Sequence, residues 1–448
     1  MEKENKILTG SLYRGIFFLS LPLIASNLLQ VLFNLSDIAV VGKFAGATAL
    51  GSVGSCTTLV TLFTGLAIGM GNGINAITAR YIGENNKNNI SKTVHTALIL
   101  SVLYGLIVMI LGFIIVRPIL ILLSTKAELL PGANLYMMIY LCGTPALCIY
   151  NCGNGILSAG GDTKRPLYYL TCAGILNIAL NLIFVIAFHM GVAGVALASA
   201  ISQWLSAFLI IRRLFCCDED YKISADKLKI DKNIAIKILS LGVPTGLQNS
   251  IFAIANLFIQ SAVNSFDTVM VEGNSAAANS DALFYDVMSA FYVAGATYIA
   301  QNFGAGNKKR IIKSYVIMLS YAFAIAFVGG LLLFFFGDKF LYLFTSEHEV
   351  VVKGMERLSI MAFSYCISAF MDATIAAVRG LGETIIPTII VILGSCVFRI
   401  AWIYTVFAYF GTIASLYLLY PFSWIITAIF EFAYFIKVYR KMYSKLLF

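Results

Sequence analysis

The sequence predicts an all-α polytopic membrane protein in which twelve transmembrane helices form two six-helix bundles, related by a parallel pseudo-twofold repeat. Three observations predict this fold. Hydrophobic residues make up 60% of the chain and charged residues 12%, and the mean hydropathy is +0.87, which is outside the range of soluble domains. The apolar runs are long enough for membrane helices and lack the two-residue alternation of barrel strands. Finally, the two halves of the chain repeat each other.

Apolar runs between polar breaks define the expected spans and their orientation. They lie at residues 16–41, 50–79, 94–116, 133–157, 167–189, 191–213, 235–265, 276–300, 312–336, 352–378, 387–409 and 412–436. With a cytoplasmic N-terminus, the cytoplasmic segments hold 23 Lys and Arg residues and the outer loops hold 5. This asymmetry places both termini in the cytoplasm. The net charge of +9 is therefore explained by the basic residues of the cytoplasmic segments, and we expect no nucleic-acid partner.

The chain divides at its longest polar segment. We predict an N-terminal six-helix bundle at 1–214, a charged cytoplasmic linker at 215–234 and a C-terminal six-helix bundle at 235–448. ARYIGENNKNNISK at 79–92 matches AQNFGAGNKKRIIK at 300–313, and AGGDTKRP at 159–166 matches GLGETIIP at 380–387, both at an offset of 221 residues. Because each half has an even number of spans, the repeat is parallel, with its axis along the membrane normal. Such a repeat suggests transport by rocking one bundle against the other.

One polar stripe runs along the first span. At about 100° per residue, Asn27, Gln30, Asn34 and Asp37 fall within roughly an 80° arc of the helix. An ionisable group inside a membrane helix is costly and usually marks an ion or substrate pathway. The amides have an alternative role as interhelical hydrogen-bonding groups. Pro22 lies in the same helix, where it removes a backbone hydrogen bond and predicts a bend.

The two halves carry their buried acids in different helices. At an offset of 222 residues, Pro22, Asn27 and Asn34 fall on Pro244, Asn249 and Asn256, but Asp37 falls on Ile259. Asp372 in the tenth span and Asp286 in the eighth are the further candidates for ion coupling. Arg399 in the eleventh span could instead hold Asp372 in a structural ion pair. Asp281, close to the outer end of its span, is expected to be solvated.

Two further spans carry amides on one face. Asn177 and Asn181 are one helical turn apart in the fifth span, and Asn249, Asn256 and Gln260 share a face of the seventh. We assign Asn177 and Asn181 to the candidate coupling site. The predicted substrate cavity comprises Asn27, Gln30, Asn34, Asn249, Asn256 and Gln260. Pro22 and Pro244 are the predicted hinges.

No motif in the sequence indicates an enzyme. HExxH, GxSxG and P-loop patterns are missing, and the 9 cysteines form no CxxC pair, so neither zinc nor a disulfide framework is predicted. We expect no cofactor apart from a proton or sodium as coupling ion.

Several segments together resemble the multidrug and toxic compound extrusion (MATE) family over essentially the whole chain. They are SLPLI in the first span, ILSAGGDTKRP after the fourth, LGVPTGLQNS opening the seventh, AAAN with AQNFGAGN around the eighth, and AVRGLGETIIP after the tenth. The likeness is closer to the DinF-like bacterial branch than to the NorM-like branch. The resemblance implies a twelve-helix antiporter in a bacterial plasma membrane, which expels amphipathic, often cationic compounds in exchange for protons or sodium.

The resemblance also implies roles for individual residues. Asp37 matches the family's carboxylate in the first span, Asn177 an asparagine of the same cluster, Asp372 an acid of the C-terminal lobe, and Pro22 the proline at which the first span bends. The chain departs from the family pattern in two places. Asn181 stands where many members carry an aspartate, and no acid lies between residues 244 and 266, so the NorM-like acid of the seventh span is missing.

These residues lead to a hypothesis for the mechanism. Asp37 is the principal coupling residue, and binding of the cation and of the drug exclude each other. Sodium at Asp37 is chemically reasonable, because hard cations take carboxylate and amide oxygens, whereas the missing acid at Asn181 favours protons. The alternative function is a flippase for lipid-linked precursors of the wider superfamily. Ligand-stimulated efflux would distinguish either transporter from a structural or signalling membrane protein. We expect the protein to be a monomer surrounded by membrane lipids.

Overall fold

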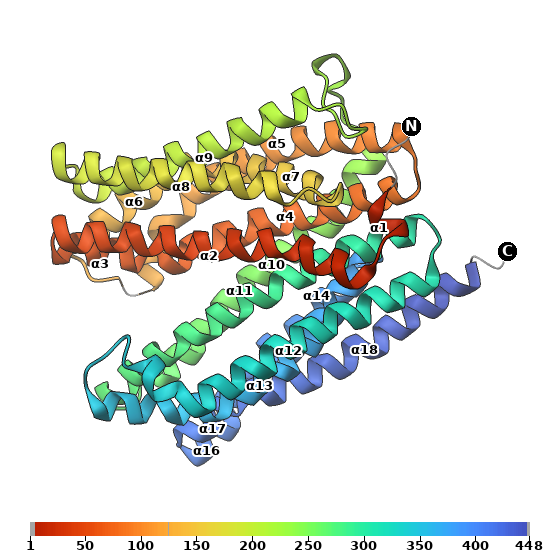
Figure 1. Cartoon of the computed structure of the whole chain (residues 1–448). Helices are drawn as coiled ribbons and strands as arrows, with labels where there is room; N and C mark the ends of the chain where they lie inside the picture. The colour runs from red at the N-terminus through yellow and green to blue at the C-terminus, as the bar shows by residue number, and fades with distance from the viewer. Residues whose placement is uncertain (1–4, 124, 446–448) are drawn as a thin grey trace. The chain divides into compact units, whose positions relative to one another are not determined.

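The computed structural model describes residues 5–123 and 125–445, with side chains as far as Lys441, and this part of the chain contains helices and loops but no strand (Figure 1). The helices of the first half are α1 (Lys6–Thr9), α2 (Leu12–Phe44), α3 (Ala47–Ser55), α4 (Thr57–Gly83), α5 (Lys87–Leu122), α6 (Leu130–Leu141), α7 (Thr144–Ala159), α8 (Lys164–Leu182), the π-helix η1 (Ile183–Ala187) and α9 (Gly191–Cys216). A 3-10 turn, η2 (Ala225–Lys227), lies in the linker. The second half holds α10 (Lys232–Val263), α11 (Thr268–Gly304), α12 (Lys308–Leu341), α13 (His348–Gly380), α14 (Ile385–Val391), η3 (Ile392–Val397), α15 (Phe398–Trp402), η4 (Ile403–Phe407), α16 (Ala408–Phe410), α17 (Ile413–Tyr417) and α18 (Leu419–Lys445).

The expected membrane spans are confirmed as helices. In the described residues, 11 helices are long and apolar enough to cross a membrane, and the bent pair of α6 and α7 brings the number to 12. The two helices of that pair meet at 46°. Pro145 explains the break, because it has no N–H and its ring clashes with the carbonyl four residues earlier. That residue is Leu141, at which α6 ends.

The described chain groups into two compact units whose limits fall inside helices. One unit is Leu21–Ser250, and the other is Met1–Ser20 together with Ile251–Phe448. Helices α2 and α10 therefore each contribute one part to each unit. The predicted domain limits at 214 and 235 describe the sequence repeat and stay a prediction.

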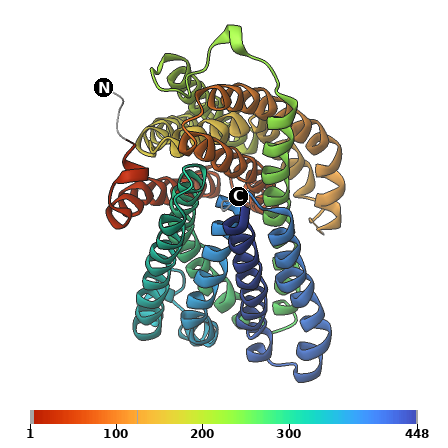
Figure 2. The ribbon, with the colours of Figure 1, turned by 90° about the vertical axis from the view of Figure 1, so that its right-hand side faces the viewer.

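Hydrogen bonds fix the start of the chain to helices of the second half. The guanidinium of Arg310 donates to the carbonyl oxygens of Ile7 at 3.0 Å and Gly10 at 2.8 Å. The amide of Asn5 donates to Gln301 at 2.9 Å. In the same unit α13 contacts α11, α12 and α18, so its side chains form the centre of the core. Figure 2 shows α18, in dark blue, beside the other helices of this unit.

Facing glycines bring α4 and the first part of α10 into backbone contact within the unit Leu21–Ser250. A Cβ atom on Gly69 would lie 2.2 Å from the backbone nitrogen of Gly246, and one on Gly73 would lie 2.6 Å from that of Gly242. Both helices thus carry small residues four positions apart, the spacing that lets membrane helices approach closely.

We expect Gly69→Ala to destabilise the protein by about 1 to 3 kcal/mol, because the added methyl group has backbone on its far side and overpacks the contact. The midpoint of thermal unfolding in detergent measures this effect. Gly54→Ala is the matched control, since a Cβ there meets nothing within 4 Å. Equal midpoints for the two variants would contradict the close helix crossing.

The linker is tied to the beginning of α5. The backbone N–H of Ser224 donates to Nε2 of His95 at 2.9 Å, so the proton of this ring lies on Nδ1, which donates to the carbonyl of Ser91 at 2.6 Å. The N–H of Asp231 donates to Thr96 at 3.0 Å. These bonds order a segment whose composition alone predicts an exposed loop.

His95→Ala is expected to loosen the linker, because it removes the acceptor of the half-buried N–H group of Ser224, a loss of about 0.5 to 1.5 kcal/mol. Trypsin should then cut faster at the exposed lysines of the linker, Lys222, Lys227 and Lys229. His348→Ala, at an exposed histidine elsewhere, should leave the cleavage rate unchanged. Unchanged cleavage of His95→Ala would show that the linker is held by other contacts.

Candidate functional site

Three helices of the unit Leu21–Ser250 bring a carboxylate and its polar partners together. Asp37 lies on α2, Asn177 and Asn181 lie one turn apart on α8, and Ser199 lies on α9. One carboxylate oxygen of Asp37 accepts from the amide of Asn181, and the other accepts from the hydroxyl of Ser199 at 3.0 Å. Asn177 links the two donors, because its amide donates to Ser199 at 3.3 Å and its oxygen accepts from Asn181 at 3.2 Å. The structure thus brings together three of the residues that the sequence assigned to coupling.

This cluster is buried and carries one formal negative charge. Asp37 is 7% exposed, Asn177 5% and Asn181 0%, and Asp37 forms no ion pair among the residues that the structure describes. The side-chain oxygen of Asn181 is buried without a hydrogen-bond partner in this part of the chain. A carboxylate beside neutral oxygens can take up a proton or hold a small hard cation. The described hydrogen-bond donors to this carboxylate are an amide and a hydroxyl, neither of which carries a charge.

Ser199 was missed by the sequence reading. It lies in a run of small residues, GVALASAIS, which gave no chemical signal other than close helix packing. Its distance of 162 residues from Asp37 also hides the pairing. Small residues at this point of α9 allow α8 to approach, and the two helices are in contact.

The other polar residues of α2 lie outside this hydrogen-bonded cluster. Asn27 and Gln30 are half-buried, whereas Asn34 is exposed. The described hydrogen bonds of Asp37 come from Asn181 and Ser199. Their assignment to a substrate cavity stays a prediction. The same holds for a hinge at Pro22, which lies within the continuous helix α2.

The amides of α10 have three different surroundings. Asn249 donates to the carbonyl of Gly65 on α4 at 3.3 Å, the interhelical role considered for such amides. Asn256 is exposed. Gln260 accepts from Asn274 at 3.4 Å and donates to Asn264 at 2.9 Å. Pro244 lies within the continuous helix, and its hinge role is likewise a prediction.

The candidate acids of the other unit lie on two different helices. Asp372 on α13 accepts from Ser368 at 3.0 Å, and Asp286 on α11 is half-buried. The suggested pair between Asp372 and Arg399 is not formed, because Arg399 donates to Ser423 at 3.1 Å instead. Asp372 thus remains a candidate coupling residue without a demonstrated structural bond to Arg399.

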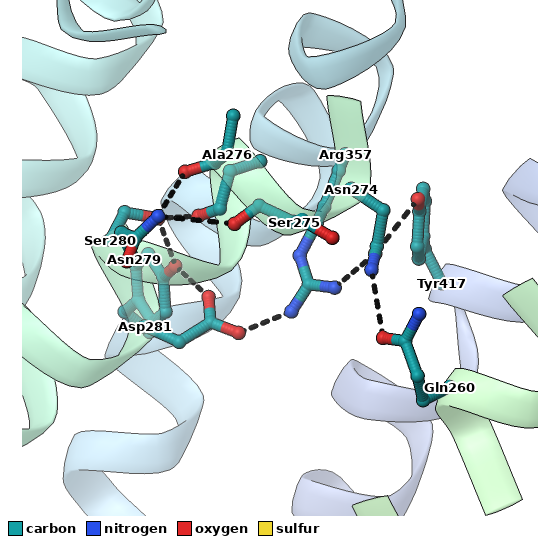
Figure 3. Close-up of polar contacts among 11 residues, drawn as sticks. Gln260, Asn274, Ser275, Ala276, Asn279, Ser280, Asp281, Arg357 and Tyr417 are labelled. Carbon is teal, nitrogen blue, oxygen red and sulfur yellow. Dashed lines mark hydrogen bonds and ion pairs between the residues drawn. The ribbon is translucent and has the colours of Figure 1, made fainter. Parts of the chain in front are cut away.

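Asp281 belongs to a polar network, and the expectation that it is merely solvated is wrong. Its carboxylate pairs with the guanidinium of Arg357 and accepts from the hydroxyl of Tyr365. Arg357 also donates to Asn274, which accepts from Tyr417 at 3.1 Å (Figure 3). The Arg357 side chain is 4% exposed and that of Asp281 30%. Sequence position near the end of a span was a poor guide, because the partner comes from α13.

Glu431 on α18 is a second residue that the sequence reading missed. It is 0% exposed, and neither carboxylate oxygen has a hydrogen-bond partner among the described residues. Its position in the apolar segment ITAIFEFAYF of the last span could have identified it, since an acid inside a span is by itself a functional signal.

Comparison with known proteins agrees with this architecture. The family model described as MatE matches residues 22–183 and again 244–405, two copies at the offset of 222 found in the sequence. "Probable multidrug resistance protein YpnP" of Bacillus subtilis is 28% identical over 80% of this chain and 80% of its own length. The "FAD transporter" of Shewanella oneidensis is 25% identical over 78% of each chain.

A solved structure has the same fold. The crystal structure of MATE in the bent conformation superimposes with a TM-score of 0.91, covers 99% of each chain and is 24% identical. The repeated family match covers well over half of the sequence, and the internal repeat predicted from the sequence is confirmed. The chain therefore belongs to the MatE family of membrane transporters.

Proposed function

We propose that the protein is a cation-coupled antiporter that exports amphipathic, often cationic drugs and toxic organic compounds by rocker-switch alternating access. The observation that carries this proposal is the buried cluster of Asp37, Asn177, Asn181 and Ser199, with a carboxylate that has no ionic partner. The sequence repeat supports the rocking of two similar bundles. Asp372 and Asp286 are secondary candidates for coupling.

The proposed exchange rests on competition for one negative charge. A cationic substrate is attracted to the unit while Asp37 is ionised. Uptake of a proton or sodium ion at Asp37 cancels that charge and lowers the affinity for the substrate, which is released outside. Coupling needs only that the ionised and the cation-bound forms of Asp37 differ in their affinity for the substrate. The effect is reciprocal, because bound substrate lowers the affinity for the cation by the same factor. Pro22 and Pro244 are the proposed bending points.

The surroundings of Asp37 suit either coupling ion. Asn181 donates its amide to the ionised carboxylate, and rotation of the amide by half a turn would present its oxygen to a protonated acid or a sodium ion. With a single acid in the cluster, proton binding makes the site neutral, which a buried environment favours. We therefore propose protons first and sodium as the alternative.

The names of the relatives support export of small compounds across a bacterial plasma membrane. YpnP is named for multidrug resistance, and the Shewanella oneidensis protein for FAD transport. We propose a monomer in contact with membrane lipids, with both termini cytoplasmic. Broad substrate range is expected, because apolar surface with scattered amides binds many amphipathic compounds weakly.

One observation favours the alternative, a flippase for lipid-linked precursors. The guanidinium groups of two arginines in the spans of the second half, Arg357 and Arg399, lie 5.4 Å and 4.8 Å from the same ring, that of Tyr420. Grouped arginines are the side chains that bind phosphate groups. Transport of a fluorescent phospholipid analogue in vesicles, compared with transport of a free organic cation, separates this alternative from the antiporter.

Binding of ethidium by the purified protein tests the proposed competition. We expect its affinity to rise at least tenfold, about 1.4 kcal/mol, from acidic to alkaline pH, because deprotonation restores the negative charge of Asp37. In Asp37→Asn the affinity should be low at every pH. If sodium is the coupling ion, added sodium chloride should weaken binding where choline chloride does not. Wild-type affinity that responds to neither ion would contradict the proposal.

A further inference from the structure

Arg399 is a buried cation surrounded by aromatic rings in the unit that holds Ile251–Phe448. Arg399 is 3% exposed. Its guanidinium carbon lies 4.8 Å from the centre of the Tyr420 ring, 5.6 Å from that of Phe252 and 5.8 Å from that of Trp424. The Nε group donates to Ser423 at 3.1 Å. Among the described residues no hydrogen bond or ion pair is formed by either Nη group.

The surrounding charges leave Arg399 uncompensated. A second guanidinium group, that of Arg357, lies 5.4 Å from the ring of Tyr420. The nearby carboxylate, Asp281, is already paired with Arg357. Asp372 accepts from Ser368 at 3.0 Å and forms no ion pair with Arg399 among the described residues. A buried charge without a close partner is costly, so the cluster lacks an anion.

Arg399 occupies a position whose counterpart in the first repeat belongs to the Asp37 cluster. At the offset of 222 residues, Arg399 corresponds to Asn177 of the Asp37 cluster, and Ile259 corresponds to Asp37 itself. The carboxylate position of the first repeat thus holds an isoleucine in the second, and the asparagine position of the first repeat holds the guanidinium of Arg399 in the second. The helix around Arg399 is irregular as well, because α15 lies between the π-helical segments η3 and η4. Such segments are frequent at functional sites.

We propose that Arg399, with Tyr420, Trp424, Phe252 and Ser423, binds the oxyanion of an aromatic or otherwise amphipathic organic ligand. This inference deepens the proposed function and rests on it, because it adds anionic and zwitterionic compounds to the substrates of the transporter. The ligand's carboxylate, sulfonate or phosphate takes the free Nη groups, and its apolar body packs on the rings.

General chemistry supports this assignment. Guanidinium groups bind carboxylates and phosphates through two parallel N–H···O bonds and stack on aromatic faces at the same time. Arg399 has the aromatic contacts and its Nε bond in place, and its outer N–H groups are the ones left over. The same oxyanion chemistry is carried by an exported compound and by the phosphate of a membrane lipid.

Binding of a matched pair of fluorescent ligands tests the site. Flavin mononucleotide and riboflavin share one aromatic ring system and differ by a phosphate. We expect wild-type protein in neutral detergent to bind flavin mononucleotide at least tenfold more tightly than riboflavin. Arg399→Asn, which installs the residue of the first repeat, should remove that preference, and Arg399→Lys should retain part of it. Arg440→Gln, at an exposed arginine of α18, should bind like wild type.

The outcomes distinguish the two sources of the anion and the two proposals. Equal wild-type affinities for the two flavins overturn the site even if Arg399→Asn fails to fold. If the preference exists in detergent and is lost in nanodiscs of phosphatidylglycerol but not of phosphatidylcholine, a lipid phosphate occupies the site and the assignment to exported compounds is overturned. These measurements use no ion gradient, so they do not depend on coupling at Asp37, and a failure of the antiport proposal would leave their result unchanged.

Discussion

Asp37→Asn is expected to abolish gradient-driven efflux while leaving the amount of protein in the membrane unchanged. Asparagine has nearly the shape of aspartate, so packing against α8 and α9 persists, and an amide can still accept from Ser199. It cannot, however, gain or lose a proton, and it offers no negative charge to a cation. Neither a proton nor a sodium ion can then be exchanged at this position, and transport should fall to the level of vesicles without the protein.

Two further variants make this result specific to the cluster. Asp338→Asn removes an exposed acid near the end of α12 and should transport normally. Ser199→Ala removes one donor to Asp37, at a cost of about 1.5 to 3 kcal/mol for a bond to a charged group, and should reduce transport by about tenfold or more. Normal coupled efflux by Asp37→Asn would eliminate Asp37 as the coupling residue.

Asp281→Asn should cause the largest loss of stability, about 3 to 5 kcal/mol, because it leaves the guanidinium of Arg357 buried without its carboxylate. Arg357→Gln should cost less. The carboxylate left behind is 30% exposed and can be hydrated, whereas the Arg357 side chain is 4% exposed. Thermal unfolding in detergent measures both.

A double-mutant cycle isolates the ion pair. In Asp281→Asn with Arg357→Gln the two neutral amides can bond to each other, so the double variant should be more stable than the sum of the single losses predicts. Tyr365→Phe, which removes the second donor to Asp281, should cost about 1 to 3 kcal/mol. Additive losses in the cycle, or equal stability of the two single variants, would contradict the network.

The membrane spans could be predicted from the sequence because the bilayer demands long apolar helices, and this signal is contained within each segment. Asp37 could be identified for the same reason, since an acid inside such a segment is conspicuous. Asn177 and Asn181 followed from their shared helix face. The bond from Asn181 to Asp37 depends on how α2 and α8 pack, which no single segment encodes.

The incorrect predictions concern contacts between residues that are far apart in the sequence. Asp281 looked like a solvated acid until α13 placed Arg357 beside it, and Arg399 looked like a partner of Asp372 although its ring contacts and Ser423 hold it elsewhere. The break between α6 and α7 was missed as well, because the apolar run continues through it. Hydropathy reports burial in lipid and is insensitive to such local interruptions.

Uptake of ethidium into proteoliposomes, driven separately by a proton gradient and by a sodium gradient, tests the central claim most directly. We predict uptake by the wild-type protein under one of the two gradients, with protons expected, and none by Asp37→Asn under either. Uptake by Asp37→Asn equal to that of the wild type would contradict coupling at Asp37. Failure of the wild-type protein to respond to either gradient would contradict cation-coupled antiport itself.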